Sequence, residues 1–212
     1  MHTENRGCLD AMNALPMFPL GSVLLPHMPL PLRVFEPRYL AMLRDILADE
    51  PSEFGVTLIE RGQEVGGGDV RTDIGTVAQI GSLDTSGESI LLIAQGVRRI
   101  RVDRWLDDAP YPRAEVSDLP DPEWSEDLAP MLERADRLVR SVLKLAEETG
   151  AELRWPPDIG LDDDPAAAAW QLAAIAPFGP LDQLDLLRST SIERLLSRTI
   201  DLAEDAHTIY SA

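Results

Sequence analysis

Residues 15–47 read LPMFPLGSVLLPHMPLPLRVFEPRYLAMLRDIL and contain two structural patterns in succession. The first half is apolar but interrupted by prolines, and a proline inside a helix removes a hydrogen bond and clashes with the preceding turn. This half is therefore predicted to form short edge strands and tight turns. The second half begins at Pro37, a favoured first position of a helix, and its regularly spaced apolar residues predict an amphipathic helix. The prolines of the first half are Pro16, Pro19, Pro26, Pro29 and Pro31.

From Leu15 to about Leu119 the chain continues with short β-rich segments separated by turn residues. Phe54–Ile59 and Gly75–Ile80 are rich in β-forming residues. Ile90–Ala94 is apolar at every position, so this segment is predicted to be a strand that is buried on both faces. Several short strands at this spacing favour a closed or half-closed barrel.

Beyond the β-rich part the pattern changes to helices. Asp121, which a proline follows, suits a helix N-terminus, and apolar residues then repeat at helical spacing up to Gly150. A further helix is predicted from Pro165, and Thr190–Glu193 matches a capping box ahead of the last helix. The sequence therefore predicts an α+β protein with a disordered leader at 1–14, a β-barrel subdomain at 15–120 and a helical bundle subdomain at 121–212.

The chain is strongly acidic, with a formal net charge of −18. The excess is spread over its length, because residues 1–120 carry 11 basic and 18 acidic side chains and residues 121–212 carry 8 and 19. Nucleic acids and anionic membranes both bind through lysine and arginine, so neither is an expected partner. One cysteine, Cys8, excludes an internal disulfide, and no apolar run reaches the roughly 20 residues of a membrane span. These features favour a cytoplasmic protein.

The residues required for hydrolytic catalysis are not arranged for it. The histidines lie in terminal segments or in a proline-rich turn, without the orienting partner and nucleophile that a catalytic imidazole needs. The only lysine, Lys144, falls on the surface of a predicted helix, and the glycine-flanked serine of a serine–lysine peptidase is absent. We therefore expect no catalytic residue. The histidines are His2, His27 and His207.

Two further segments resemble ligand sites only superficially. Gly66–Gly68 lacks the following lysine with which a phosphate-binding loop neutralises its ligand. Asp162–Asp164 leads into the proline that starts a helix, whereas a calcium loop needs further oxygen ligands at alternate positions. No cofactor and no metal are expected.

A polar group surrounds the start of the helix predicted at Pro37. Arg98 shares strand parity with inward-facing apolar residues, unless a bulge resets the register. A buried arginine needs a partner, because an isolated buried charge is very costly. We therefore expect Arg98 or Arg38 to pair with Glu36 and to fix the helix to the barrel.

Six segments share their order and residue types with one known family. They are Leu15–Leu20, Phe35–Tyr39, Phe54–Val56, Gly75–Ile80, Gln95–Val102 and Pro180–Leu187. Together they resemble the Lon substrate-binding (Lon N-terminal) domain family, over about residues 15–205. The resemblance implies a PUA-like β pseudo-barrel with one inserted helix, followed by a C-terminal α-helical bundle.

The same resemblance implies a function in polypeptide recognition. In the family this domain recognises unfolded or degron-bearing polypeptides and passes them to ATPase and protease modules, which this sequence lacks. The expectation is a stand-alone, non-enzymatic adaptor or quality-control module that works with a separate protease or chaperone. Flexible methionines suit permissive apolar binding. The candidate contact residues near the proline-rich entry are Met17, Phe18, Leu25, Met28 and Tyr39, although each of them taken singly is expected to lie in the core.

Three other functions remain open at this point. A barrel pocket that holds a metabolite would make the protein a small-ligand sensor, and a deep polar and aromatic pocket would favour it. The domain would alternatively be an accessory subunit of an ATP-dependent protease. A hydrolase is the third, and the missing serine–lysine chemistry argues against it. A shallow apolar groove would favour peptides.

Overall fold

The computed structural model describes residues 14–48, 50–61, 70–87 and 89–211. The predicted leader, Cys8 and the Gly66–Gly68 loop lie outside the described residues. The chain forms two compact units, a β unit that runs to Leu24 and again from Pro29 to Leu119, and a helical unit that comprises Leu25–Met28 and the residues from Pro120 onward.

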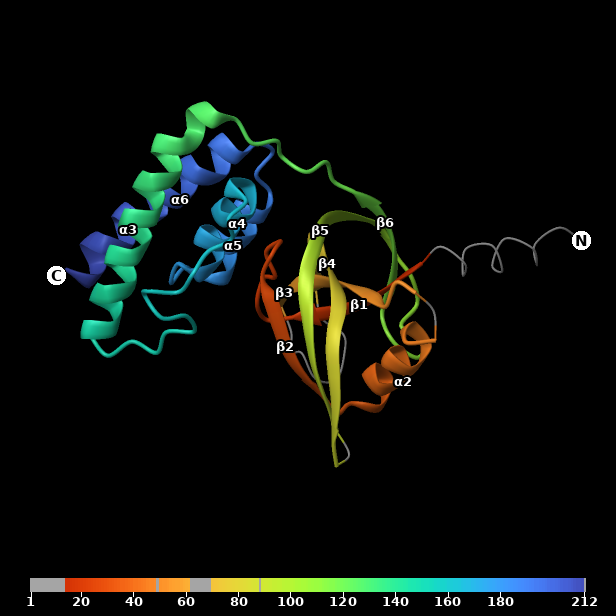
Figure 1. Ribbon diagram of the computed structural model, residues 1–212. Helices are drawn as coiled ribbons and strands as arrows, with labels where there is room; N and C mark the ends of the chain where they lie inside the picture. The colour runs from red at the N-terminus through yellow and green to blue at the C-terminus, as the bar shows by residue number, and fades with distance from the viewer. Residues whose placement is uncertain (1–13, 49, 62–69, 88, 212) are drawn as a thin grey trace, which may run out of the picture. The chain divides into compact units, whose positions relative to one another are not determined.

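In its described residues, the β unit is built from six strands and one helix (Figure 1). The amphipathic helix begins at Pro37, as predicted, and its buried stripe comprises Tyr39, Met42, Leu43 and Ile46. The elements are β1 (Leu15–Leu20), β2 (Pro29–Val34), α2 (Pro37–Ile46), β3 (Glu53–Arg61), β4 (Val70–Ser86), β5 (Ser89–Trp105) and β6 (Arg113–Asp118).

The strands form one sheet that closes on itself. Their order is β2-β5-β4-β3-β1-β6, and β5 pairs with β6 as well, so that β5, β4, β3, β1 and β6 make a closed ring. β1 pairs with β3 in parallel and the other pairs are antiparallel. β2 pairs only with β5 and is therefore an edge strand.

β5 pairs with β4 along one edge, and along its other edge it pairs first with β2 and then with β6, because it bends in its middle. Its first half pairs with β2 and its second half pairs with β6. Between them the register with β4 shifts from Ala78–Gly96 to Val77–Arg98, which leaves Val97 as the extra residue of a bulge. A bulge bends a strand and increases its twist, so the bulge turns β5 from one partner to the other.

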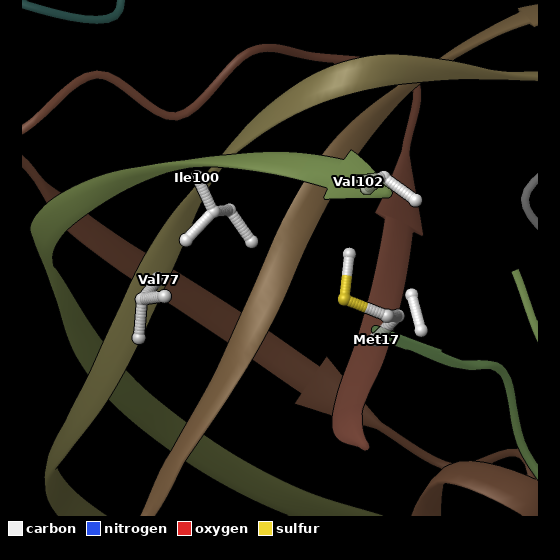
Figure 2. Close-up of a cluster of buried hydrophobic side chains, with 5 residues drawn as sticks. Met17, Val77, Ile100 and Val102 are labelled. Atoms are coloured by element: carbon white, nitrogen blue, oxygen red, sulfur yellow. The ribbon is translucent and has the colours of Figure 1, made fainter. Parts of the chain in front are cut away.

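Apolar side chains fill the interior of the ring. Figure 2 shows Met17, Val77, Ile100 and Val102 converging there from β1, β4 and β5. Ala114 of β6 completes this buried cluster. The interior is thus a packed core.

A second core lies between β1, β3 and α2. The rings of Phe18 and Tyr39 stack with centroids 4.0 Å apart, and Phe54 packs against Phe18 at 5.9 Å. These contacts join the helix to the sheet through buried aromatic area, which contributes about 0.5–1.5 kcal/mol per pair beyond burial alone.

The helical unit contains four α-helices preceded by a short 3₁₀ turn. The first α-helix begins at Ala129, seven residues later than the sequence suggested, because residues 121–125 are irregular and Glu126–Leu128 forms the 3₁₀ turn. The cap of the last helix is Ser191, which accepts from the Arg194 N–H, rather than the residue before it. The elements are η1 (Glu126–Leu128), α3 (Ala129–Glu148), α4 (Pro165–Ile175), α5 (Pro180–Leu187) and α6 (Ile192–Tyr210).

Two segments without regular structure belong to this helical unit, the loop after α3 and the four residues Leu25–Met28. The loop that follows α3 is held by Arg140, which donates to the carbonyls of Pro157 and Ile159 at 2.7 and 3.0 Å. The Leu25–Met28 segment turns at His27, whose φ of 63° is left-handed, and its carbonyl accepts a 3.4 Å hydrogen bond from Gln171 of α4. The α+β class and the C-terminal helical region predicted from the sequence are confirmed.

Candidate functional site

An open apolar groove lies on the β unit, over the ladder formed by β2, β5 and β4. Its volume is about 490 Å³. Leu91 and Ile93 of β5 are the exposed apolar residues at its centre, with 42% and 53% of their surface accessible. Three consecutive residues from each strand line it: Pro31, Leu32 and Arg33, Ser82, Leu83 and Asp84, and Leu91, Leu92 and Ile93.

The groove corrects the prediction that the Ile90–Ala94 strand is buried on both faces. Leu92 and Ala94 are buried, but Leu91 and Ile93 point to the other face and are exposed. Here β4 and β5 run as a long hairpin with β2 alongside (Figure 1). Successive side chains of a strand face opposite sides. Only the side of Leu92 and Ala94 is covered by other parts of the protein, so the apolar residues on the opposite side remain exposed.

Two cross-strand rows of residues define the groove floor. Arg33, Leu91 and Asp84 lie directly opposite one another on the three strands, and Pro31, Ile93 and Ser82 form the next row. Directly opposed residues share a face and lie about 4.5–5.5 Å apart. Leu91 therefore has a charged residue on each side of it, Arg33 on β2 and Asp84 on β4.

The edge of β2 next to the groove is poorly suited to pairing with another strand. Antiparallel strands use every second residue for their mutual hydrogen bonds, and Pro29 and Pro31 have no N–H to donate. The bonds of β2 to β5 therefore fall to Leu30, Leu32 and Val34, and the outward positions are Pro29, Pro31 and Arg33. Prolines at such positions leave a row with few donors, which blocks strand addition.

A second pocket, of about 440 Å³, is polar and lies beside the end of α2. Tyr111 donates to the Asp45 carboxylate at 3.1 Å. Burial, and then this hydrogen bond, raise the pKa of Tyr111 above its ordinary value. Opposite them, Arg98 forms a bidentate pair with Glu53 at 2.6 and 2.7 Å. The charged groups of this pocket are thus engaged with one another.

The five candidate contact residues are all buried, as expected of each residue taken singly, so they do not form the exposed apolar surface that the contact hypothesis requires. Met17 lies inside the ring, and Phe18 and Tyr39 stack beneath α2. Leu25 and Met28 belong to the segment that packs with the helical unit. Their apolar character serves packing, and the proline-rich entry brings them into three different parts of the core.

The expected ion-pair network is divided between two places. Arg38 lies 3.1 Å from Glu36, and its guanidinium lies 4.5 Å above the Tyr39 ring. Arg98 is instead half-exposed and pairs with Glu53 and Asp118, which raises its pKa through the hydrogen bond to Glu53 first. Arg98 lies opposite Val77 and shares strand parity with Ile100, as predicted, but its carboxylate partners are Glu53 and Asp118 rather than Glu36. The link between α2 and the sheet is aromatic.

The described part of the chain offers no group of three or more histidine, cysteine or acidic residues placed to hold a metal ion. Among the helices of that same part, none combines the length and apolar character required to cross a bilayer.

A closed sheet with an edge strand and an inserted helix, followed by a helical unit, defines the class of Lon-type substrate-binding domains. The chain belongs to the family described as the ATP-dependent protease La (LON) substrate-binding domain, whose model matches residues 14–205. The resemblance found in the sequence is therefore confirmed.

Curated relatives are Lon proteases from bacteria. The chain is 34% identical over 148 residues to Lon protease 2 of Myxococcus xanthus and 31% identical over 148 residues to Lon protease of Anaeromyxobacter dehalogenans (strain 2CP-C). Each alignment covers 67% of this chain, but only 18% and 17% of the relatives. The chain thus spans less than a fifth of the length of the relatives that it matches.

Solved structures share the fold over nearly the whole chain. The Lon N-terminal domain protein from Xanthomonas campestris aligns with a TM-score of 0.63 and 28% identity, over 89% of this chain and 97% of that one. The N-terminal domain of Mycobacterium avium complex Lon protease aligns with a TM-score of 0.65 and 17% identity, over 91% and 98%. The second likeness concerns the fold alone.

Proposed function

We propose that this domain recognises unfolded polypeptides and that the groove over β2, β5 and β4 is where they bind. The observation that carries the proposal is the exposure of Leu91 and Ile93 at the centre of an open apolar depression. Contiguous exposed apolar surface on a protein of this size marks an interaction site. Membership of a substrate-binding family supplies the class of ligand.

The mode of binding is side-chain docking. Strand addition needs a row of free backbone donors and acceptors along an edge, and Pro29 and Pro31 remove donors from the outward edge of β2. A bound segment therefore gains its affinity from apolar side chains seated on the floor of the groove. Such binding tolerates many sequences, which suits a receptor of unfolded chains.

The packing of the β unit favours this proposal over a metabolite sensor. Met17, Val77, Ile100, Val102 and Ala114 pack together in the ring interior, which is apolar and lacks the polar groups that a metabolite site would use. The polar pocket beside α2 has its charged groups paired internally. A shallow apolar groove is the shape that an extended polypeptide requires.

The adaptor role follows from the same proposal. A domain that holds unfolded chains without cutting them delivers them to a separate protease or chaperone. We expect casein to remain intact after incubation with the purified protein and ATP, as judged by gel electrophoresis. ATP-dependent cleavage would contradict the non-enzymatic role.

Fluorescence anisotropy with a labelled, unstructured apolar peptide tests the binding site. The groove variant replaces Leu91 and Ile93 with serine. Its matched control replaces Leu181 and Ile209 of the helical unit, whose surfaces are 71% and 72% accessible, with serine. We expect the groove variant to bind the peptide at least about tenfold more weakly, because residues at the centre of an interface dominate its energy.

The control variant should bind as the unchanged protein does. Circular dichroism confirms that both variants retain the fold. Failure of the unchanged protein to bind any apolar peptide would refute the proposed function. Equal binding by the groove and control variants would refute the assignment of the groove.

A further inference from the structure

Of the two charged side chains at the groove, Arg33 has a hydrogen-bond partner and Asp84 has no ion-pair partner among the described residues. Arg33 donates from its Nε to the hydroxyl of Ser89 at 3.2 Å, and this serine is buried. Asp84 lines the groove from β4 and forms no ion pair with any residue that the structure describes. The carboxylate therefore remains available at the rim, whereas the guanidinium is held towards the protein.

The wider electrostatic field has the same sign as Asp84. Residues 1–120, which contain the whole β unit together with the Leu25–Met28 segment, carry a net charge of −7, within a total of −18. A net charge of this kind attracts oppositely charged partners and speeds their association. The same negative charge makes the binding of an acidic chain less favourable, because like charges repel when the two surfaces come together.

We propose that the groove selects cationic apolar segments, in which a lysine or arginine lies close to the apolar residue that docks on Leu91. This inference rests on the proposed function and names its substrate class. In an extended segment, residues two apart lie on the same face at about 6.6 Å. A lysine two positions from the docked residue thus reaches Asp84, which lies one strand from Leu91.

Selection by charge explains how an apolar groove discriminates without reading a sequence. The apolar floor supplies affinity to any hydrophobic segment. The Asp84 carboxylate and the negative field of the protein then favour basic segments and disfavour acidic ones. Acidic segments of this chain itself are excluded from its groove by the same rule, which opposes self-capture at a net charge of −18.

Three labelled peptides of one length test the inference. They share their apolar residues and carry lysine, glutamine or glutamate at the flanking positions, and a fourth peptide keeps the lysines but replaces the apolar residues with serine. Affinities are measured by anisotropy at about 50 mM and about 300 mM salt, because screening shortens the reach of charge over this range. Asp84→Asn is compared with Asp201→Asn, which removes the same charge from an exposed position on α6.

We expect the lysine peptide to bind about tenfold more tightly than the glutamate peptide at low salt, with a smaller ratio at high salt. The lysine peptide without apolar residues should bind weakly. Asp84→Asn should weaken binding of the lysine peptide about two- to fivefold, as for an exposed ion pair, and leave the glutamine peptide unchanged. Asp201→Asn should have a smaller effect on the lysine peptide.

Each contrary result has a distinct meaning. Equal affinity of the three apolar peptides would overturn the charge selection and leave the proposed function intact. Equal effects of Asp84→Asn and Asp201→Asn would overturn the role of Asp84. If none of the apolar peptides binds, the proposed function itself fails.

Discussion

The two halves of β5 are both apolar, yet they meet different surroundings. Ile100 and Val102 point into a closed ring where other strands cover them, while Leu91 and Ile93 lie on a three-stranded ladder open to solvent. The residue types are nearly the same. The difference is that the second half of β5 pairs with β6 and closes the ring, and the first half pairs with an edge strand. Strand pairing therefore decides which half of β5 contributes apolar residues to the core and which half leaves them exposed.

The largest effect on stability is expected in the closed ring. Met17→Ala removes a fully buried side chain from its centre and should lower the free energy of unfolding by about 3 kcal/mol, since lost burial and a cavity both contribute. Urea denaturation measures it. Ile93→Ser, on the open ladder, should change stability by no more than about 0.5 kcal/mol. Equal losses in the two variants would remove the distinction between the closed ring and the open ladder.

A smaller loss of stability is expected at Gly75, where the backbones of β3 and β4 approach one another closely. A Cβ added at Gly75 would lie 2.2 Å from the Val56 carbonyl oxygen, so β3 and β4 would have to separate. Gly75→Ala should therefore cost about 2 kcal/mol, the order found for overpacked cores. Gly81→Ala is the control on the same strand, because its nearest contact is 3.5 Å away. Thermal unfolding that is unchanged in Gly75→Ala would contradict the close approach.

The Tyr111–Asp45 hydrogen bond should contribute stability that depends on pH. Burial and this bond raise the pKa of Tyr111 in the folded protein, so the protonated phenol favours the folded state. The contribution is complete below the unfolded pKa of about 10 and is lost as pH rises towards the folded pKa. Tyr111→Phe should cost about 1 kcal/mol near pH 8, and its difference from the unchanged protein should shrink above pH 10. A difference that stays constant from pH 8 to 11 would contradict this assignment.

The smallest effect on stability is expected at the open edge of β2. Pro31→Val restores a backbone donor to that edge and should leave the free energy of unfolding within about 0.5 kcal/mol. It should nevertheless increase concentration-dependent association, because unpaired edges template further strands. Sedimentation velocity measures the association, with Pro156→Val in the helical unit as the control. A monomer–oligomer distribution that Pro31→Val does not alter would show that the edge is already closed by other means.

Much of the fold follows from local patterns in the sequence. Pro37 and the apolar stripe after it predicted α2 correctly, and Asp164 caps α4 as its position before a proline suggests. The predicted start of α3 was wrong, because a residue suited to an N-cap at Asp121 is not sufficient to begin a helix. The chain becomes helical only at Glu126–Leu128. Local signals fix what a segment prefers, but packing decides where it begins.

The candidate site was harder to predict, because exposure depends on which strands become neighbours. Met17 and Phe18, which were candidates for a contact surface, are buried, and the apolar pair Leu91 and Ile93 was expected in the core and is exposed. The signal that could have found the groove was present in β5, which is apolar on both faces. Without knowledge that β2 ends the sheet, nothing in the sequence distinguishes a covered face from an open one.

The assignment of Leu25–Met28 to the helical unit bears on how the protein can be divided. The chain passes between the two units three times, after Leu24, after Met28 and after Leu119. A cut between Leu119 and Pro120 therefore yields two fragments, of which the second lacks a segment that contains the buried Leu25 and Met28. The first fragment holds every residue of the β unit, whereas the second lacks the buried segment that belongs to the helical unit. We therefore expect the second fragment to be the one that fails to fold when it is produced alone.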